Sequence, residues 1–155
     1  MPISRFSHLG LCVVDLERSL GFYVQGLGFA EEARLRMKGA DVERLLGLSD
    51  AELVAVYLVR DGTRIELLHY PSRQLRAGEA ARPMDQPGLT HLSLRVEHLD
   101  ATLAELESLG GSVLEQTRID RPEHATSAIF VLDPDRIRVE LVEAPGDPSR
   151  PPVGG

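Results

Sequence analysis

The chain is poor in several residues that often carry function. Its 155 residues include no tryptophan, one cysteine and only 5% aromatic residues. A single cysteine, Cys12, excludes an internal disulfide and a cysteine-based zinc site, and it agrees with a reducing compartment. The scarcity of rings leaves few surfaces on which a planar aromatic ligand could stack.

Long hydrophobic runs and basic clusters are also missing. No apolar run approaches the roughly 20 residues that cross a bilayer, and the Met-Pro-Ile-Ser-Arg start lacks the apolar core of a signal peptide. The formal net charge of −7 disfavours nucleic acid as a partner, and no Gly-rich phosphate loop is present. We therefore expect a cytoplasmic protein that binds neither membranes nor nucleic acids.

The sequence contains an internal repeat. THLSLRV at residues 90–96 matches SHLGLCV at residues 7–13, so that His8 corresponds to His91. Six further positions agree: Leu9, Leu11, Val13, Leu16, Leu20 and Gly28 correspond to Leu92, Leu94, Val96, Leu99, Leu103 and Gly111. Farther on, YLVRDGTRIELLHYP matches VLDPDRIRVELVEAP and pairs Glu66 with Glu140. This pattern indicates a duplicated supersecondary module rather than a repeat array. The first copy is longer, and its extra residues are expected within 38–53.

Each copy predicts the order βαβββ. In the first, Asp15 is the expected N-cap of a helix that ends at Gly26 and Gly28, and Asp61-Gly62 predicts a hairpin. The expected strands are 8–14, 29–37, 53–60 and 63–70. In the second copy a helix at 99–109 lies among strands at 90–97, 112–118, 126–132 and 136–143. We expect an α+β fold with one domain over residues 1–145, made of modules 5–71 and 88–145, a linker at 72–87 and a disordered tail at 146–155.

One histidine and one glutamate of each copy are predicted to share a face. Residues two apart in a strand point to the same side of the sheet. Leu9, Leu11 and Val13 would pack against the helix, which puts His8 on the opposite face. Glu66 lies opposite Ile65 and Leu67 in the same way, and His91 and Glu140 repeat the arrangement in the second copy.

Two imidazoles and two carboxylates are costly to bury unless they are paired, and a divalent cation removes that cost. We therefore predict that His8, Glu66, His91 and Glu140 hold one divalent ion. Mixed nitrogen and oxygen donors suit zinc, nickel, cobalt, manganese or ferrous iron. His69, His98 and His124 have no counterpart in the other copy, and we expect them at the surface or in loops.

These residues make the sequence resemble the vicinal oxygen chelate superfamily, which includes glyoxalase I, methylmalonyl-CoA epimerase, extradiol dioxygenases and antibiotic-resistance proteins. The resemblance covers residues 5–144. It rests on the stretches His8–Leu11, Asp15–Leu20, Phe22-Tyr23, Leu27–Phe29, Ile65–Leu67, Thr90–Leu92, Asp133-Pro134 and Val139–Leu141. It implies two tandem modules that form a curved, mixed, eight-stranded sheet, a cup with the helices outside, and it implies a homodimer.

The ligand set resembles that of glyoxalase I. The epimerases usually carry Gln at the position of Glu66, and the dioxygenases have no carboxylate there. Two departures stand out: Leu68-His69-Tyr70-Pro71 replaces the tract that glyoxalase I uses near glutathione, and Arg136 stands where the family's DPDG turn has Gly.

The leading hypothesis is a metal-dependent isomerase or lyase that moves a proton next to a carbonyl, in a thiol hemiacetal or acyl thioester, through a metal-bound enediolate. By resemblance, Glu140 is the first candidate for the base and Glu66 the second. An iron-dependent ring-cleaving dioxygenase and a non-catalytic antibiotic-binding protein remain as alternatives.

Other side chains are candidates for binding the small-molecule substrate. Arg95, with Arg64 or Arg138 as alternatives, could anchor an anionic end. Cys12, Ser93 and Tyr70 could line the cavity. The surplus segment around Val42, Leu45 and Leu46 could form a lid that excludes water.

Overall fold

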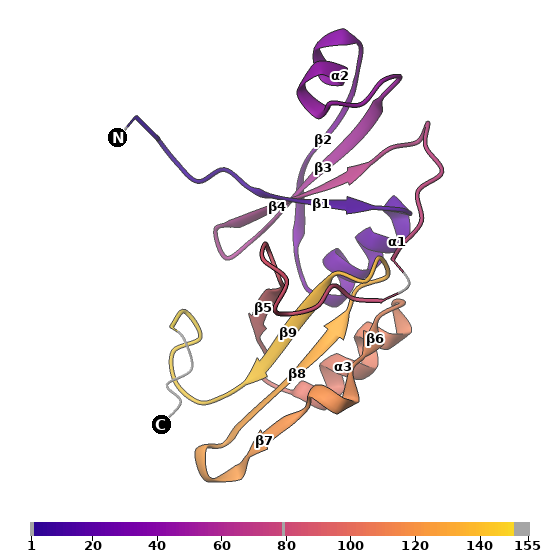
Figure 1. Cartoon of the computed structure of the whole chain (residues 1–155). Coiled ribbons are helices and arrows are strands. Elements are labelled where there is room, and N and C mark those ends of the chain that lie inside the picture. Colours follow the sequence, from indigo (N-terminus) through magenta and orange to yellow (C-terminus); the bar gives the residue numbers. More distant parts are fainter. Residues whose placement is uncertain (1, 79, 151–155) are drawn as a thin grey trace. The chain divides into compact units, whose positions relative to one another are not determined.

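The computed structural model describes residues 2–78 and 80–150 and divides into two compact units, the first ending at Ala77 and the second beginning at Gly78 (Figure 1). Each unit contains one mixed sheet. Over the described residues, no helix has the length and hydrophobicity of a membrane span. The predicted α+β class with two related halves is confirmed.

The first unit is built on a four-stranded sheet. Its strands are β1 (Leu9–Val13), β2 (Ala30–Lys38), β3 (Glu52–Arg60) and β4 (Thr63–His69). Their order is β1-β4-β3-β2, with β1 parallel to β4 and the other pairs antiparallel. Asp61 and Gly62 both have positive φ between β3 and β4, as the predicted Asp-Gly hairpin requires.

The helix of the first unit differs in form from the prediction. It begins as α1 (Leu16–Leu20) after Asp15, whose carboxylate accepts a hydrogen bond from the Arg18 backbone N–H. It then continues as a π-helical segment, Gly21–Gly26. That wider turn buries the rings of Phe22 and Tyr23 completely, in edge-to-face contact at 5.4 Å.

The surplus of the first unit forms a short helix, α2 (Ala40–Leu46), which ends at Gly47 in the left-handed conformation. Leu46 packs with Met37 and Leu48 against buried Leu53 and Ala55, whereas Leu45 is 86% exposed. The segment is therefore anchored to β3 by one face. Its role as a lid stays a prediction.

The second unit is built on a five-stranded sheet. Its elements are β5 (Leu92–Arg95), α3 (Leu99–Ser108), β6 (Ser112–Val113), β7 (Ile119–Arg121), β8 (Thr126–Leu132) and β9 (Arg138–Glu143). The main path runs β5-β9-β8-β6, and β7 pairs with β8. Helix α3 contacts β6, β8 and β9.

The expected strand at 112–118 was wrong in its length. Only Ser112–Val113 forms a strand, followed by a 3₁₀ turn at Glu115–Thr117 and by β7. The Thr117 hydroxyl donates to the Leu114 carbonyl and accepts from the Phe130 backbone N–H. A side-chain oxygen thus accepts the hydrogen bond that a backbone carbonyl of a neighbouring strand would otherwise accept. Threonine competes with regular strand pairing in this way.

The two units repeat the register that matters for the site. In β4, Glu66 lies beside Gly10 of β1 and Tyr57 of β3. In β9, Glu140 lies beside Ser93 of β5 and Phe130 of β8. The flanking residues Ile65, Leu67, Val139 and Leu141 are fully buried on the other face.

Three sequence predictions concern the organisation of the whole chain: the cup, the division into modules and linker, and the tail. The joining of both sheets into one eight-stranded cup and the division into modules and linker stay predictions. In the expected disordered tail, Asp147 accepts hydrogen bonds from the backbone N–H and hydroxyl of Ser149. Residues 151–155 lie outside the described residues.

Candidate functional site

In the first unit, His8 and Glu66 are in direct contact. His8 Nε2 lies 3.0 Å from Oε2 of Glu66, whose side chain is only 10% exposed. The other ring nitrogen of His8 shares a hydrogen bond of 2.9 Å with the Ser7 hydroxyl. Both histidine nitrogens are thus engaged, and Nε2 is the one directed at the carboxylate.

The second unit repeats this pair. His91 Nε2 lies 3.7 Å from Oε2 of Glu140, and its Nδ1 shares a 2.9 Å hydrogen bond with the Thr90 hydroxyl. The Glu140 side chain is 30% exposed, so this carboxylate is more open to solvent than that of Glu66. Within each unit, the histidine and the glutamate that were predicted to share a face lie side by side.

An aromatic ring supports each histidine. Tyr57 meets His8 edge-on with 5.4 Å between ring centroids, and Phe130 meets His91 at the same distance and nearly the same angle. Each ring belongs to the antiparallel neighbouring strand, at the residue that pairs with the glutamate. The rings restrict how far the imidazoles can turn, which keeps Nε2 directed at the carboxylate.

Each carboxylate also receives a hydroxyl, from a different neighbour in each unit. The Tyr57 hydroxyl donates to Glu66, and this bond raises the pKa of Tyr57, with burial as the second cause. Ser93 Oγ donates to Glu140 Oε2 over 2.6 Å. At the position of Ser93 the first unit has Gly10, where a Cβ would meet Leu68 Cδ1 at 3.2 Å. The tyrosine therefore supplies the hydroxyl that β1 lacks.

These donors are chemically suited to a divalent ion. Imidazole Nε2 and carboxylate oxygens are common ligands of zinc, manganese, cobalt and iron, and a hydrogen bond on Nδ1 is the usual support of a ligating histidine. Each unit by itself supplies two such donors. Among residues 2–78 and 80–150, no group of three or more His, Cys, Asp or Glu side chains is placed to hold a metal.

Of the other substrate-binding candidates, Cys12 and Tyr70 lie near one another at the end of the first sheet. Cys12 is exposed, and it lies two residues beyond Gly10 on the side of His8. Tyr70 is buried beside Leu53 and Ala55. Burial raises the pKa of Tyr70, and the charges of Cys12 and Glu66 raise it further.

Arg95 is tied to the backbone that follows β9. Its guanidinium donates to the carbonyls of Ala144 and Pro145, the second at 3.2 Å. Two of its donors are therefore used within the unit. Arg64 is likewise engaged, with Glu32 and with the Ser7 carbonyl.

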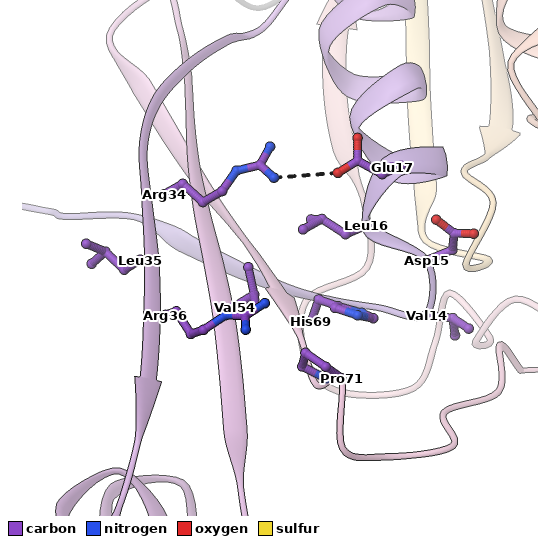
Figure 2. Close-up of a pocket in the computed structure, with 10 residues that line it drawn as sticks. All are labelled: Val14, Asp15, Leu16, Glu17, Arg34, Leu35, Arg36, Val54, His69 and Pro71. Atoms are coloured by element: carbon purple, nitrogen blue, oxygen red, sulfur yellow. Dashed lines mark ion pairs between the residues drawn. The ribbon is translucent and has the colours of Figure 1, made fainter.

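A pocket of about 840 Å³ lies elsewhere in the first unit (Figure 2). Arg34 of β2 reaches toward Glu17 of α1, and the two form an ion pair at 3.5 Å. The pocket is also lined by Val54 and His69. His69 lies in β4 three residues after Glu66, so its side chain points to the opposite face and the pocket is separate from the His8–Glu66 pair.

His69 was expected in a loop or at the surface, and this was wrong. It is the last residue of β4, half-buried, and paired with Val13 and Val54. Its Nδ1 atom is buried with no hydrogen-bond partner among the described residues. His98 and His124 are exposed, as expected.

Comparison with known proteins identifies the family. The family model described as "Glyoxalase/Bleomycin resistance protein/Dioxygenase superfamily" matches residues 5–141. The chain belongs to this superfamily. The match spans both His–Glu pairs.

Two curated relatives cover nearly the whole chain. YwkD from Bacillus subtilis is 30% identical over 144 residues, which is 92% of this chain and 99% of that protein. Human mitochondrial methylmalonyl-CoA epimerase is 25% identical over 145 residues, covering 92% of this chain and 75% of its own length.

Solved structures of the glyoxalase superfamily share the fold. A glyoxalase family protein from Bacillus cereus has a TM-score of 0.78 at 19% identity, covering 94% of this chain and 97% of its own. The fosfomycin resistance protein FosX from Listeria monocytogenes, solved as a variant with Mn(II) and 1S,2S-dihydroxypropylphosphonic acid, has a TM-score of 0.57 at 16% identity. It covers 90% of this chain and 89% of its own.

Proposed function

We propose that this protein is a divalent-metal-dependent isomerase or lyase that moves a proton next to a carbonyl. The proposal is carried by one observation: each unit presents the same histidine–glutamate pair, held by a hydroxyl on Nδ1 and by an aromatic ring. Duplicated, supported pairs of this kind are expected of metal ligands, because second contacts orient the ligating atoms.

The proposal joins both pairs, His8–Glu66 and His91–Glu140, around one ion, in one chain or across a homodimer. Two donors per unit are too few for the usual coordination of a divalent ion. Two carboxylates also balance the +2 charge and leave a neutral site. A bound ion would stabilise negative charge that develops on the carbonyl oxygen of the substrate.

The two glutamates would divide the work. Glu66 is nearly buried, contacts His8 and accepts a hydrogen bond from Tyr57, so it is held in place. Glu140 is more exposed and lies farther from its histidine. We infer that Glu140 takes the proton from the α-carbon and that Glu66 mainly orients the site and serves as the second proton acceptor.

The proposed chemistry requires a glutamate close to the reacting carbon of the substrate. General bases act best when they can reach the proton within hydrogen-bond distance and when water is excluded. The relative named methylmalonyl-CoA epimerase supports a carbonyl substrate in this superfamily, and FosX with Mn(II) supports a divalent ion on this fold. Cys12, Ser93, Arg95 and Tyr70 stay proposed contacts of a small-molecule substrate.

The test begins with the metal content of the protein expressed without added metal, by elemental analysis. The metal-loaded protein is then assayed for hydrogen–deuterium exchange at the α-carbon of thiol adducts and acyl thioesters by NMR. Glu140→Gln should lower the exchange rate by about 10²- to 10⁴-fold, the usual contribution of a general base. Glu107→Gln, an exposed carboxylate on α3, is the matched control.

Each result has a defined meaning. Unchanged exchange in metal-loaded Glu140→Gln contradicts the base assignment. Purified protein that holds iron and consumes oxygen with a catechol would be a ring-cleaving dioxygenase instead. Protein that binds no metal but takes a planar drug in stoichiometric amount would be a binding protein.

A further inference from the structure

The repeat duplicates an arginine as well as the ligands. Arg64 precedes Glu66 by two residues in β4, and Arg138 precedes Glu140 by two residues in β9. Side chains two apart in a strand share a face, and their Cα atoms lie about 7 Å apart. Both guanidinium groups therefore start from the face that carries the His–Glu pairs.

In the first unit this arginine is neutralised. Arg64 binds both carboxylate oxygens of Glu32 through Nε and Nη2, the latter at 2.7 Å. This bidentate bond lowers the pKa of Glu32. Arg64 also donates to the Ser7 carbonyl. Little of its donor capacity is left for a ligand.

In the second unit the equivalent arginine has no carboxylate partner within residues 2–78 and 80–150. The hydrogen bond that Arg138 makes goes to the sulfur of Met84 at 3.0 Å, a weak acceptor. Its guanidinium carbon lies 5.5 Å from the Phe130 ring centroid. A guanidinium has five N–H donors, so most of its capacity is unused.

Phe130 links this cation to the candidate site. The same ring supports the guanidinium of Arg138 and the imidazole of His91. Arg138 is half-buried, so its position is restricted by packing. A guanidinium stacked on an aromatic ring keeps its N–H groups directed outward, and two parallel N–H groups of this kind can bind a carboxylate.

We propose that Arg138 anchors a carboxylate of the substrate, so that the substrate class is a small carbonyl compound with a negatively charged oxygen group near the reacting carbon. This inference rests on the proposed function. It assigns to Arg138 the anchoring role for which the sequence had first favoured Arg95, because Arg95 is engaged with the Ala144 and Pro145 carbonyls. It also predicts selectivity, since an acidic chain of net charge −7 otherwise repels anions.

The experiment compares two ligands with the same hydroxy-acid end. Malate and 2-hydroxybutyrate can each chelate a metal through the hydroxyl and the adjacent carboxylate, and they differ in a distal carboxylate against a methyl group. The intact protein is loaded with Co²⁺, metal binding is verified by titration, and affinities are measured by calorimetry. The visible Co²⁺ spectrum reports chelation independently of activity.

The wild-type protein should bind malate about 10-fold or more tighter than 2-hydroxybutyrate, because a charge-assisted hydrogen bond is among the stronger polar contacts. Arg138→Gln should bring the ratio close to one and leave 2-hydroxybutyrate binding within about threefold. Arg138→Lys should recover part of the preference, because lysine restores the positive charge but not the parallel N–H donors of a guanidinium. Arg64→Gln is the matched control and should keep the preference.

The outcomes separate this inference from the proposed function. A wild-type protein that binds Co²⁺ and both hydroxy acids equally, or an Arg138→Gln variant that keeps the preference, overturns the role of Arg138 while the metal site stands. Loss of the preference in Arg64→Gln and not in Arg138→Gln would place the anchor in the first unit and also overturns it. Failure of the wild-type protein to bind Co²⁺ overturns the proposed function, and the inference falls with it.

Discussion

The two units hold the same histidine–glutamate pair but use different hydroxyl donors to the glutamate. In both, a glutamate in the middle of a strand faces the histidine that directly precedes the parallel neighbouring strand, and an aromatic ring meets that histidine edge-on. In the first unit the antiparallel neighbour supplies the hydroxyl, through Tyr57. In the second unit the parallel neighbour supplies it, through Ser93, and the antiparallel neighbour has Phe130.

The difference shows what the fold holds constant and what it leaves open. Register fixes which backbone positions adjoin the carboxylate, so either neighbouring strand can carry the hydroxyl donor. Glu66 accepts from the Tyr57 hydroxyl of the antiparallel neighbour and Glu140 from Ser93 of the parallel one. The side chain of Glu66 is 10% exposed and that of Glu140 is 30% exposed. One duplicated pair thus becomes a fixed carboxylate and a more accessible one.

The largest effect on stability should come from shortening a buried leucine side chain beneath each histidine–glutamate pair. Leu67 and Leu141 each follow the glutamate by one residue and are fully buried. Replacing either with alanine should lower the free energy of unfolding by about 2–5 kcal/mol, because a cavity remains where the side chain packed. Urea unfolding followed by circular dichroism measures the loss.

The two core variants also test how alike the units are. Leu45→Ala, at a residue 86% exposed, is the control and should change stability by less than about 0.5 kcal/mol. A loss at only one of the two leucines would contradict the equivalence of the two cores.

The next largest effect concerns the hydroxyl that differs. Tyr57→Phe removes the donor to Glu66 and should lower the free energy of unfolding of the metal-free protein by about 1–2 kcal/mol, since hydrogen bonds to charged groups exceed neutral ones. If Glu66 is a ligand, Mn²⁺ affinity measured by calorimetry should fall about 10- to 100-fold, as for other supporting contacts of metal ligands.

The matched variant is Phe130→Tyr, which adds a hydroxyl to the ring of the second unit. Glu140 already accepts from Ser93, so this change should alter Mn²⁺ affinity by less than about threefold. Equal effects of both substitutions would mean that the tyrosine hydroxyl has no particular role at Glu66.

The sequence alone predicted the repeat and predicted that one histidine and one glutamate of each copy share a face of the sheet. It succeeded because alternation fixes which side chains share a face, and because two copies reinforce a weak pattern. It could not predict the π-helical segment after Leu20 or the 3₁₀ turn that ends β6 at Val113. The 3₁₀ turn is tied to β8 by the bond from the Phe130 backbone N–H to the Thr117 hydroxyl, which spans 13 residues and which no local pattern encodes. The π-helical segment buries Phe22 and Tyr23, and the helical spacing of apolar residues does not distinguish it from an α-helix.

The supporting rings were missed for a specific reason. The ungapped match of the two copies places Tyr57 opposite Val131, a core residue, and not Phe130. Phe130 pairs with Glu140, ten residues later, whereas Tyr57 pairs with Glu66, nine residues later, so the connection in the second unit contains one extra residue. A one-residue slip moves every side chain to the other face. A gap placed in the turn would have aligned the two rings.

These turns themselves offer a smaller and more precise comparison. Gly62 and Arg136 both have positive φ, 74° and 70°, but only glycine adopts that conformation without strain. Arg136→Gly should therefore raise the free energy of unfolding by about 0.5–1 kcal/mol, and Gly62→Arg should lower it by about 1 kcal/mol. Thermal unfolding of the two variants measures both, and changes of the same sign would contradict the explanation.

The smallest effect belongs to β7, which pairs with the start of β8 as the end of β2 pairs with the start of β3. Asp120 accepts hydrogen bonds from the Ser127 hydroxyl at 2.7 Å and from Arg118 at 3.1 Å, and these contacts lower its pKa. Because the folded protein holds the proton less tightly than the unfolded chain, this carboxylate stabilises the fold above its ordinary pKa and loses that contribution as the pH falls. Asp120→Asn should thus reduce the difference between the urea midpoints at pH 6 and pH 3, and Glu107→Gln should leave it unchanged. An unaltered difference in Asp120→Asn would show that β7 is held by its backbone pairing with β8 alone.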